Sequence, residues 1–302
     1  MVSKNTGAGK RGLDCGPVWA RRCGMARGRF SVFVVGFWLA VGVAAGTCLI
    51  MERNAMTVVV SDRVEEVRRR VLPSLQAEVQ ARGLMVGAPV FLRSFKESFE
   101  IEVWLEPGPG RAFEYFRTYR TASWGPGSLG PKLKEGDLQS PEGFYAVGLG
   151  QLNPRSAYHL AFNVGYPNAL DAALGRTGSF IMVHGGEASI GCLAVTDESI
   201  EEIYLLVEAA LRAGQSAIEL HLFPFRPTPA RLSRATGHPS LGFWRNLGEG
   251  YDFFERGKRP PRVFVENGRY GFRHEASSEA AGGPVVEGQI TSDKPGWTVD
   301  GD

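Results

Sequence analysis

One short segment of the chain carries the residue types that nucleophilic chemistry needs. His184 ends an apolar run, and Cys192 lies eight residues later, after a glycine-rich stretch. A cysteine nucleophile needs a base or cation that favours the thiolate, and donors for the oxyanion that forms on the attacked carbonyl. We therefore identify Cys192 as a candidate nucleophile and His184 as its candidate general base.

The loop between these residues suits the same chemistry. Gly191 lets the backbone approach a substrate closely, so the amides of Ile190, Gly191 and Cys192 form the candidate oxyanion hole. No acid stands at an obvious triad position, and a backbone carbonyl near Gly185 is expected to orient the imidazole. The alternative is that His184 is an ordinary strand-end histidine and Cys192 a small core residue.

The start of the chain predicts export. Residues 1–29 are basic, and residues 30–51 form a run of 22 residues without a charge. A helix of that length reaches roughly 33 Å, which is enough to cross a bilayer, and the basic flank stays in the cytoplasm. We interpret 1–29 as a cytoplasmic or n-region and 30–51 as a signal peptide or membrane anchor. The alternative is a buried core helix.

Cysteine usage then favours catalysis. The four cysteines are Cys15, Cys23, Cys48 and Cys192, so the exported body holds only Cys192, without a disulfide partner. The body is expected in the periplasm or cell envelope, where an unpaired thiol is a liability. Either Cys192 is buried and inert, or the protein needs a thiol, and the nearby histidine favours the second interpretation.

Composition excludes several other classes of protein. Hydrophobic residues make up 43% of the 302 residues and the net charge is +2, so the chain is neither largely disordered nor a dedicated nucleic-acid binder. No cofactor is expected. A zinc site from His159, His184 and Cys192 lacks a close ligand pair, so no metal is expected either. A papain-like protease is disfavoured because its cysteine precedes its histidine.

Hydrophobic periodicity predicts the elements that would position the site. An amphipathic helix is expected at 61–83, a helix with acidic residues at its start at 196–214, and an aromatic-rich helix at 241–255. A glycine- and proline-rich loop is expected at 125–143, and a disordered tail at 275–302. The expected strands are 90–95, 99–105, 112–120, 144–149, 158–164, 179–183 and 217–223.

Several motifs in the right order resemble one known family. The pair His184-Gly185 followed by Ser189-Ile190-Gly191-Cys192 is similar to the active-site signature of the L,D-transpeptidase catalytic domain (YkuD-type) family. Ser140-Pro141-Glu142-Gly143 resembles its threonine-proline-x-glycine segment. Segments that resemble the YafK-like branch are Tyr158-His159-Leu160, Gly165-Tyr166-Pro167-Asn168, Gly175-Arg176-Thr177-Gly178, Phe223-Pro224-Phe225-Arg226 and Phe243-Trp244-Arg245-Asn246-Leu247. The resemblance covers about 61–271.

Two departures from the wider family agree with this branch. Ile190 stands where many members carry a second histidine, and the interval between the histidine and cysteine elements is shorter than usual. The resemblance implies an α+β fold, a mostly β and β-sandwich-like domain with one helix after the catalytic cysteine, plus N- and C-terminal helices. The catalytic domain would span 88–226, and 227–272 would be a C-terminal extension packed on it.

The resemblance also implies the reaction. Cys192 would attack a peptidoglycan stem peptide at diaminopimelate, His184 would act as base, and the thioester would pass to an amine. A hydrolase of the same fold, an amidase or L,D-endopeptidase, stays open, as does an inactive wall-binding module. The implied partners are stem peptides, a wall-linked lipoprotein, and the membrane through 30–51.

Four further residues flank the site segments and are candidates for substrate binding. A charged pocket would suit the carboxylates of a stem peptide, and an arginine can bind a carboxylate with two hydrogen bonds. For Arg176 the alternative is an ordinary salt bridge. Lys132, in the glycine- and proline-rich loop, is expected to be solvated. The four candidates are Tyr158, His159, Arg176 and Ser189.

Overall fold

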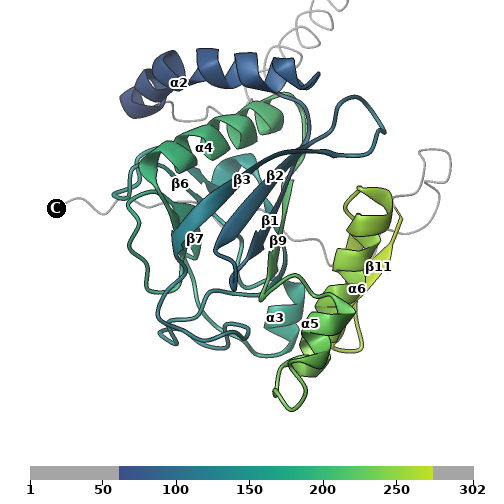
Figure 1. Ribbon diagram of the computed structural model, residues 1–302. Helices are drawn as coiled ribbons and strands as arrows, with labels where there is room; N and C mark the ends of the chain where they lie inside the picture. Colours follow the sequence, from purple (N-terminus) through teal and green to yellow (C-terminus); the bar gives the residue numbers. More distant parts are fainter. Residues whose placement is uncertain (1–60, 275–302) are drawn as a thin grey trace, which may run out of the picture. The chain divides into compact units, whose positions relative to one another are not determined.

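A curved run of β-strands forms the body of the protein in a computed structural model that describes residues 61–274 (Figure 1). In this part of the chain nine strands follow the order β4-β9-β1-β2-β3-β8-β7-β6-β5. The pairs β1–β9 and β7–β8 are parallel and the others are antiparallel. The strands are β1 Val90–Phe95, β2 Glu100–Leu105, β3 Glu114–Ser123, β4 Gly143–Val147, β5 Leu152–Asn153, β6 Ala161–Asn163, β7 Met182–His184, β8 Leu193–Val195 and β9 Ile218–Phe223.

Two helices cover one face of the strands. Helix α4 (Asp197–Arg212) packs on the sheet, and helix α2 (Asp62–Ala81) lies across α4 (Figure 1). Each begins at a hydroxyl cap: Ser61 accepts from the Val64 N–H at 3.3 Å, and Thr196 accepts from the Ser199 N–H at 3.2 Å. Acidic residues in both first turns complement the helix dipoles.

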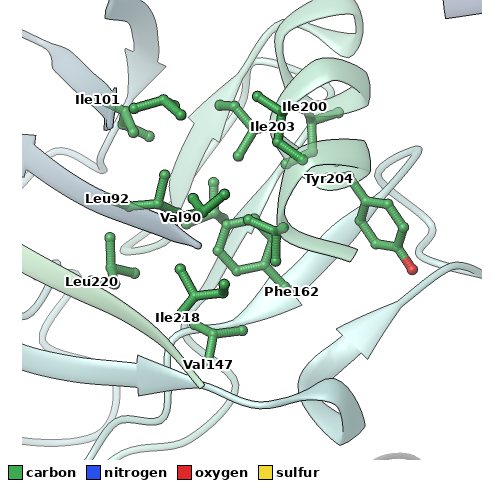
Figure 2. Packing of buried hydrophobic residues seen from close by; sticks show 14 of the residues in the cluster. Val90, Leu92, Ile101, Val147, Phe162, Ile200, Ile203, Tyr204, Ile218 and Leu220 are labelled. Carbon is green, nitrogen blue, oxygen red and sulfur yellow. The ribbon is translucent and has the colours of Figure 1, made fainter. Parts of the chain in front are cut away.

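The main hydrophobic core lies between these helices and the strands. Figure 2 shows Ile200 and Ile203 of α4 meeting Leu92 of β1, Phe162 of β6 and Ile218 of β9. All five side chains are at most 1% exposed. Burial of one such side chain contributes about 1.5–3 kcal/mol. The periodicity that predicted the two helices is therefore the same feature that places their apolar side chains in this core.

Aromatic residues dominate the opposite face. Helix α6 (Leu241–Gly257) and the hairpin of β10 (Arg262–Glu266) and β11 (Arg269–Arg273) pack there through Trp244 and Tyr270. The ring centroids of Phe144 and Tyr270 are 4.8 Å apart in an edge-to-face arrangement. Two short helices complete the described fold, α3 (Ala169–Ala173) and α5 (Pro229–Ser233), with a 3-10 turn at Leu149–Gln151.

The predicted fold class is confirmed: the body is mostly β, with one helix after the cysteine and helices at both ends. The strands expected at 158–164 and 179–183 are only three residues long, because the backbone before them forms loops. Strand β8 and the β10–β11 hairpin were not predicted. The three residues of β8 are too few for alternation to be visible, and a strand of that length depends on its neighbours. The hairpin strands have five residues each and flank Asn267-Gly268, a turn signal that went unrecognised.

Three predicted segments lie outside the described residues: the basic segment 1–29, the apolar run 30–51 and the tail 275–302. Between residues 61 and 274, no helix has both the length and the hydropathy that a bilayer span requires.

Candidate active site

Strands β7 and β8 bring the candidate nucleophile and base together. They pair in parallel, with Val183 opposite Leu193 and His184 opposite Ala194. Cys192 directly precedes β8, and its Sγ accepts a hydrogen bond from the Met182 N–H at 3.4 Å. Met182 is two residues before His184 on the same strand, a distance of about 7 Å along the backbone. The thiol thus lies at the start of β7 and the imidazole at its end.

The imidazole of His184 is held in one tautomer. Its Nδ1 lies 2.5 Å from the carbonyl oxygen of Gly185. A carbonyl only accepts, so Nδ1 carries the proton and Nε2 is left as the acceptor. The ring of Tyr158 packs against the imidazole with centroids 4.8 Å apart. His184 is 4% exposed, whereas Tyr158 is 55% exposed and forms its outer cover.

Burial keeps both groups neutral in this state. It lowers the pKa of His184, and the hydrogen bond to Gly185 offsets part of the effect. Burial also raises the pKa of the Cys192 thiol, while the Met182 N–H and the charge of Lys132 act in the opposite direction. The thiol points its proton toward the Phe180 carbonyl, 3.6 Å from Sγ. Within the described part of the chain, no hydrogen bond joins this thiol to the His184 ring.

The glycines after His184 fit tightly against the start of α4. A Cβ at Gly185 would overlap Oδ1 of Asp197 and lie 3.1 Å from Cγ2 of Ile200. The next amide, Gly186 N–H, donates to the same Asp197 oxygen at 2.9 Å. The sequence predicted that a carbonyl near Gly185 orients the imidazole. The steric need for glycine at this position depends on α4, which lies more than ten residues further along the chain.

Hydroxyl groups organise the loop that carries Cys192. Ser189 Oγ accepts from the Gly191 N–H at 3.0 Å and donates to the Cys192 carbonyl at 2.7 Å. Gly191 has φ +142°, a conformation that other residues rarely adopt. Ser140 Oγ lies 2.8 Å from the Gly191 carbonyl and 2.8 Å from the Trp124 carbonyl. Its single proton bonds one of them at a time.

This arrangement changes the assignment of two predicted residues. The amide of Gly191 already donates to Ser189, and Gly125 packs so closely that a Cβ there would lie 2.7 Å from it. In this state Gly191 is therefore not a free oxyanion donor, and the amides of Ile190 and Cys192 stay the candidates. The hydroxyl of Ser189, which was predicted to bind substrate, instead makes hydrogen bonds within the loop.

A buried ion pair between Lys96 and Glu142 stabilises the segment around Ser140, which contacts the loop that carries Cys192. Lys96 Nζ lies 3.0 Å from Glu142 Oε1 and donates to the Ser140 carbonyl at 2.6 Å. Both charged side chains are at most 4% exposed. The other carboxylate oxygen of Glu142 accepts from the Trp244 Nε1–H at 2.7 Å. Sequence analysis did not identify this network, whose other members lie 44 to 148 residues after Lys96.

Two predicted substrate-binding residues have partners elsewhere. Arg176 pairs with Asp171 at 2.7 Å, with side chains 9% and 1% exposed. The salt bridge of the alternative is therefore present, although it is buried and not superficial, and a role of Arg176 in substrate binding stays a prediction. His159 Nε2 lies 2.8 Å from Glu201 Oε1 on α4, so its ring is turned to that helix. Tyr158 is the member of the predicted set that contacts the base.

The expectation for Lys132 was wrong. It is 4% exposed and pairs with Asp137 at 2.7 Å, because the glycine- and proline-rich loop folds back over it. The acid five residues downstream was the available sequence signal. For a metal ion, residues 61–274 offer no group of three His, Cys, Asp or Glu side chains.

Comparisons with known proteins identify the family. No family model matches the chain. It is 39% identical over 208 residues to the protein named "Putative L,D-transpeptidase YafK" of Escherichia coli K12, which covers 69% of this chain and 81% of that protein. The protein of the same name from Escherichia coli O157:H7 gives the same values, 39% identity over 208 residues.

Solved structures with a similar arrangement have lower identity. A mutant form of the helical cell shape determining protein Pgp2 from Campylobacter jejuni is 21% identical, with a TM-score of 0.35, and the match covers 55% of this chain and 57% of that one. L,D-transpeptidase 1 of Mycobacterium tuberculosis is 14% identical, with a TM-score of 0.27 and coverage of 46% and 64%. On the strength of the identity to the Escherichia coli proteins, the chain belongs to the L,D-transpeptidase family, in its YafK branch.

Proposed function

We propose that the protein is a cell-envelope cysteine acyltransferase that acts on peptidoglycan stem peptides at diaminopimelate. The observation that carries this proposal is the fixed tautomer of His184. With Nδ1–H bound to the Gly185 carbonyl, the basic Nε2 is available to take the proton of a thiol held at the other end of the same strand.

The first half-reaction forms a thioester. Cys192 Sγ attacks the carbonyl carbon while its proton passes to Nε2 of His184. The carbonyl oxygen takes up negative charge next to the amides of Cys192 and Ile190. The carbon–nitrogen bond of the donor then breaks, and its amine leaves with the proton from Nε2. Because both groups start neutral, this proton transfer accompanies the attack and no ion pair exists beforehand.

The second half-reaction decides between transfer and hydrolysis. An acceptor amine that loses its proton to Nε2 makes a new amide and releases the thiolate, which recovers that proton. Water at the same position makes a carboxylate instead. Hydrolysis, the second candidate, is favoured by the open surroundings of the thiol: Ile190 and Phe180 are 76% and 62% exposed, so they leave the neighbourhood accessible to water.

Digestion of peptidoglycan distinguishes these functions. Purified protein is incubated with sacculi and the soluble products are identified by mass spectrometry. A transferase gives new crosslinks or new amide adducts when an amine acceptor is present, and a hydrolase gives only shorter species. Cys192→Ser should abolish both, since its hydroxyl is a much poorer nucleophile beside the same imidazole. Unchanged sacculi with the wild-type protein, and no adduct of Cys192 with a carbapenem at near-neutral pH, would support a wall-binding module.

A further inference from the structure

One loop contacts both segments that flank the thiol. Residues 132–139 meet the stretch before β7, where the Thr177 N–H donates to the Leu133 carbonyl at 3.1 Å. A Cβ at Gly178 would lie 2.7 Å from Cε of Lys132. Gly178 is only two residues before Phe180, whose carbonyl faces the thiol. The start of the loop therefore packs on one wall of the site.

The end of the same loop packs on the other wall. A Cβ at Gly191, the residue before the nucleophile, would lie 3.3 Å from the carbonyl oxygen of Gln139 and 3.7 Å from the carbonyl carbon of Leu138. The loop thus bridges the segment that ends in Phe180 and the segment that ends in Cys192. The side chain of Lys132 leaves this loop next to Gly178, on the side of the site that ends in Phe180.

The base of the loop holds a buried ion pair. Lys132 Nζ lies 2.7 Å from Asp137 Oδ1 and donates to the Lys134 carbonyl at 2.9 Å. The two charged side chains are 4% and 12% exposed. The other oxygen of Asp137 accepts from the Leu133 N–H at 2.7 Å. Charges that are shielded from water interact more strongly with nearby ionisable groups than solvated charges do, so this ion pair affects the pKa of groups close to it.

The thiol is one of those groups. The positive charge of Lys132 lowers the pKa of the Cys192 thiol against the effect of burial. Asp137 carries the opposite charge next to Lys132 and cancels part of its field. Removing the carboxylate of Asp137 should therefore increase the effect of the Lys132 charge on the thiol.

We propose that Lys132 is a positioning residue of the reaction, which stabilises the Cys192 thiolate, and that Asp137 sets how much of the lysine charge reaches it. The inference rests on the proposed thioester chemistry. A thiolate develops when the Sγ proton passes to Nε2 of His184, and again when the thioester breaks. A fixed cation lowers the energy of both states.

Alkylation of Cys192 by iodoacetamide tests the proposal without any substrate. The thiolate forms the sulfur–carbon bond, iodide leaves, and the rate against pH reports the ionisation of the thiol. Lys132→Met keeps the length of the side chain without its charge. We expect its pH midpoint to rise and its rate at pH 7.5 to fall by roughly three- to tenfold. Lys132→Arg should restore the wild-type midpoint.

Asp137→Asn is the decisive counterpart. It removes the carboxylate that cancels the lysine field, so its midpoint should fall and its rate should rise. Lys134→Met, an exposed charge in the same loop, should leave the midpoint unchanged. If the pair only holds the loop together, Lys132→Met and Asp137→Asn change the rate in the same direction and leave the midpoint in place, which would overturn the proposal. Thermal unfolding of each variant checks its fold, and Asp137→Asn alone still decides if Lys132→Met does not fold.

The same experiment separates this inference from the proposed function. Opposite shifts of the midpoint support the role of the ion pair even for a protein that leaves sacculi unchanged. Sacculus turnover together with unshifted midpoints would refute the role of Lys132 and leave the acyl transfer intact.

Discussion

Gly185→Ala is the substitution that most directly tests how the base is held. The new Cβ would overlap Asp197 Oδ1 and lie 3.1 Å from Ile200 Cγ2 and 3.2 Å from His159 Cβ. The Asp197 carboxylate can rotate, although it then loses the Gly186 N–H. Ile200 is fully buried in the core and cannot move aside. The strain must therefore displace the strand end that carries the imidazole.

The magnitude follows from two separate effects. Overpacking by one methyl group costs about 1–3 kcal/mol of stability, which is about 2–12 °C in melting temperature for a domain of this size. Movement of the Gly185 carbonyl releases Nδ1 of His184, so the imidazole loses its tautomer and direction. General base catalysis contributes roughly 10²- to 10⁴-fold, so we expect acylation to slow by about 100-fold or more. The rate of acylation should thus fall by about 100-fold or more, while the melting temperature falls by only about 2–12 °C.

The assay pairs the rate of acyl-enzyme formation, followed by intact-protein mass spectrometry with a stem peptide, with urea unfolding. Gly242→Ala is the matched control, since no atom lies within 4 Å of its new Cβ and it lies in helix α6. Asp197→Ala added to Gly185→Ala removes the closest overlap and should recover part of the lost stability. A Gly185→Ala protein that acylates at the wild-type rate would refute the role assigned to this carbonyl.

Three further outcomes are expected. His221 is buried among Phe91, Phe144 and neighbouring rings, and burial lowers its pKa. The folded state therefore binds fewer protons than the unfolded state below about pH 6.5, so the protein loses stability as the pH falls. His221→Phe should reduce the stability lost between about pH 6.5 and 4.5, as measured by urea titrations. A variant as acid-sensitive as the wild type would contradict this. Lys96→Met leaves the Glu142 carboxylate buried without its cation and should cost about 3–5 kcal/mol by chemical denaturation. A cost below about 1 kcal/mol would show that the pair contributes little. Because burial lowers the pKa of His184, kcat/KM should hold its plateau below pH 6.5, and an acid midpoint above that value would exclude it as the base.

Long periodic elements were predictable because their signal is local. The stripe of apolar residues that predicted the helix at 61–83 corresponds to α2, whose buried side chains are Val64, Val67, Leu75 and Val79. The Thr196 cap and acidic first turn likewise predicted α4. Strand β8 could not be predicted, since three residues next to a glycine turn become a strand only by pairing with β7 and β3.

The partners of charged side chains were the least predictable feature. Arg176 and Lys132 both appear in polar, glycine-containing segments, each with an acid five residues away. That spacing allows an ion pair, but it does not show whether the pair is buried. Their burial depends on which other segments pack against them. For Arg176 one such residue is Phe243, whose ring centroid lies 4.9 Å from the guanidinium carbon. Phe243 lies on α6, far along the chain, so the loop sequence alone carries no trace of it.

The amino-acid sequence by itself determined the candidate chemistry: the thiol of Cys192, a histidine eight residues before it, and glycines that let the backbone turn between them. Those properties belong to residue types and to short distances along the chain. Only the tertiary structure decided that Nε2 is the basic nitrogen of His184, that the Gly191 amide donates to Ser189, and that Lys132 is buried beside Asp137. Each depends on hydrogen bonds and burial among segments that the folded chain brings into contact.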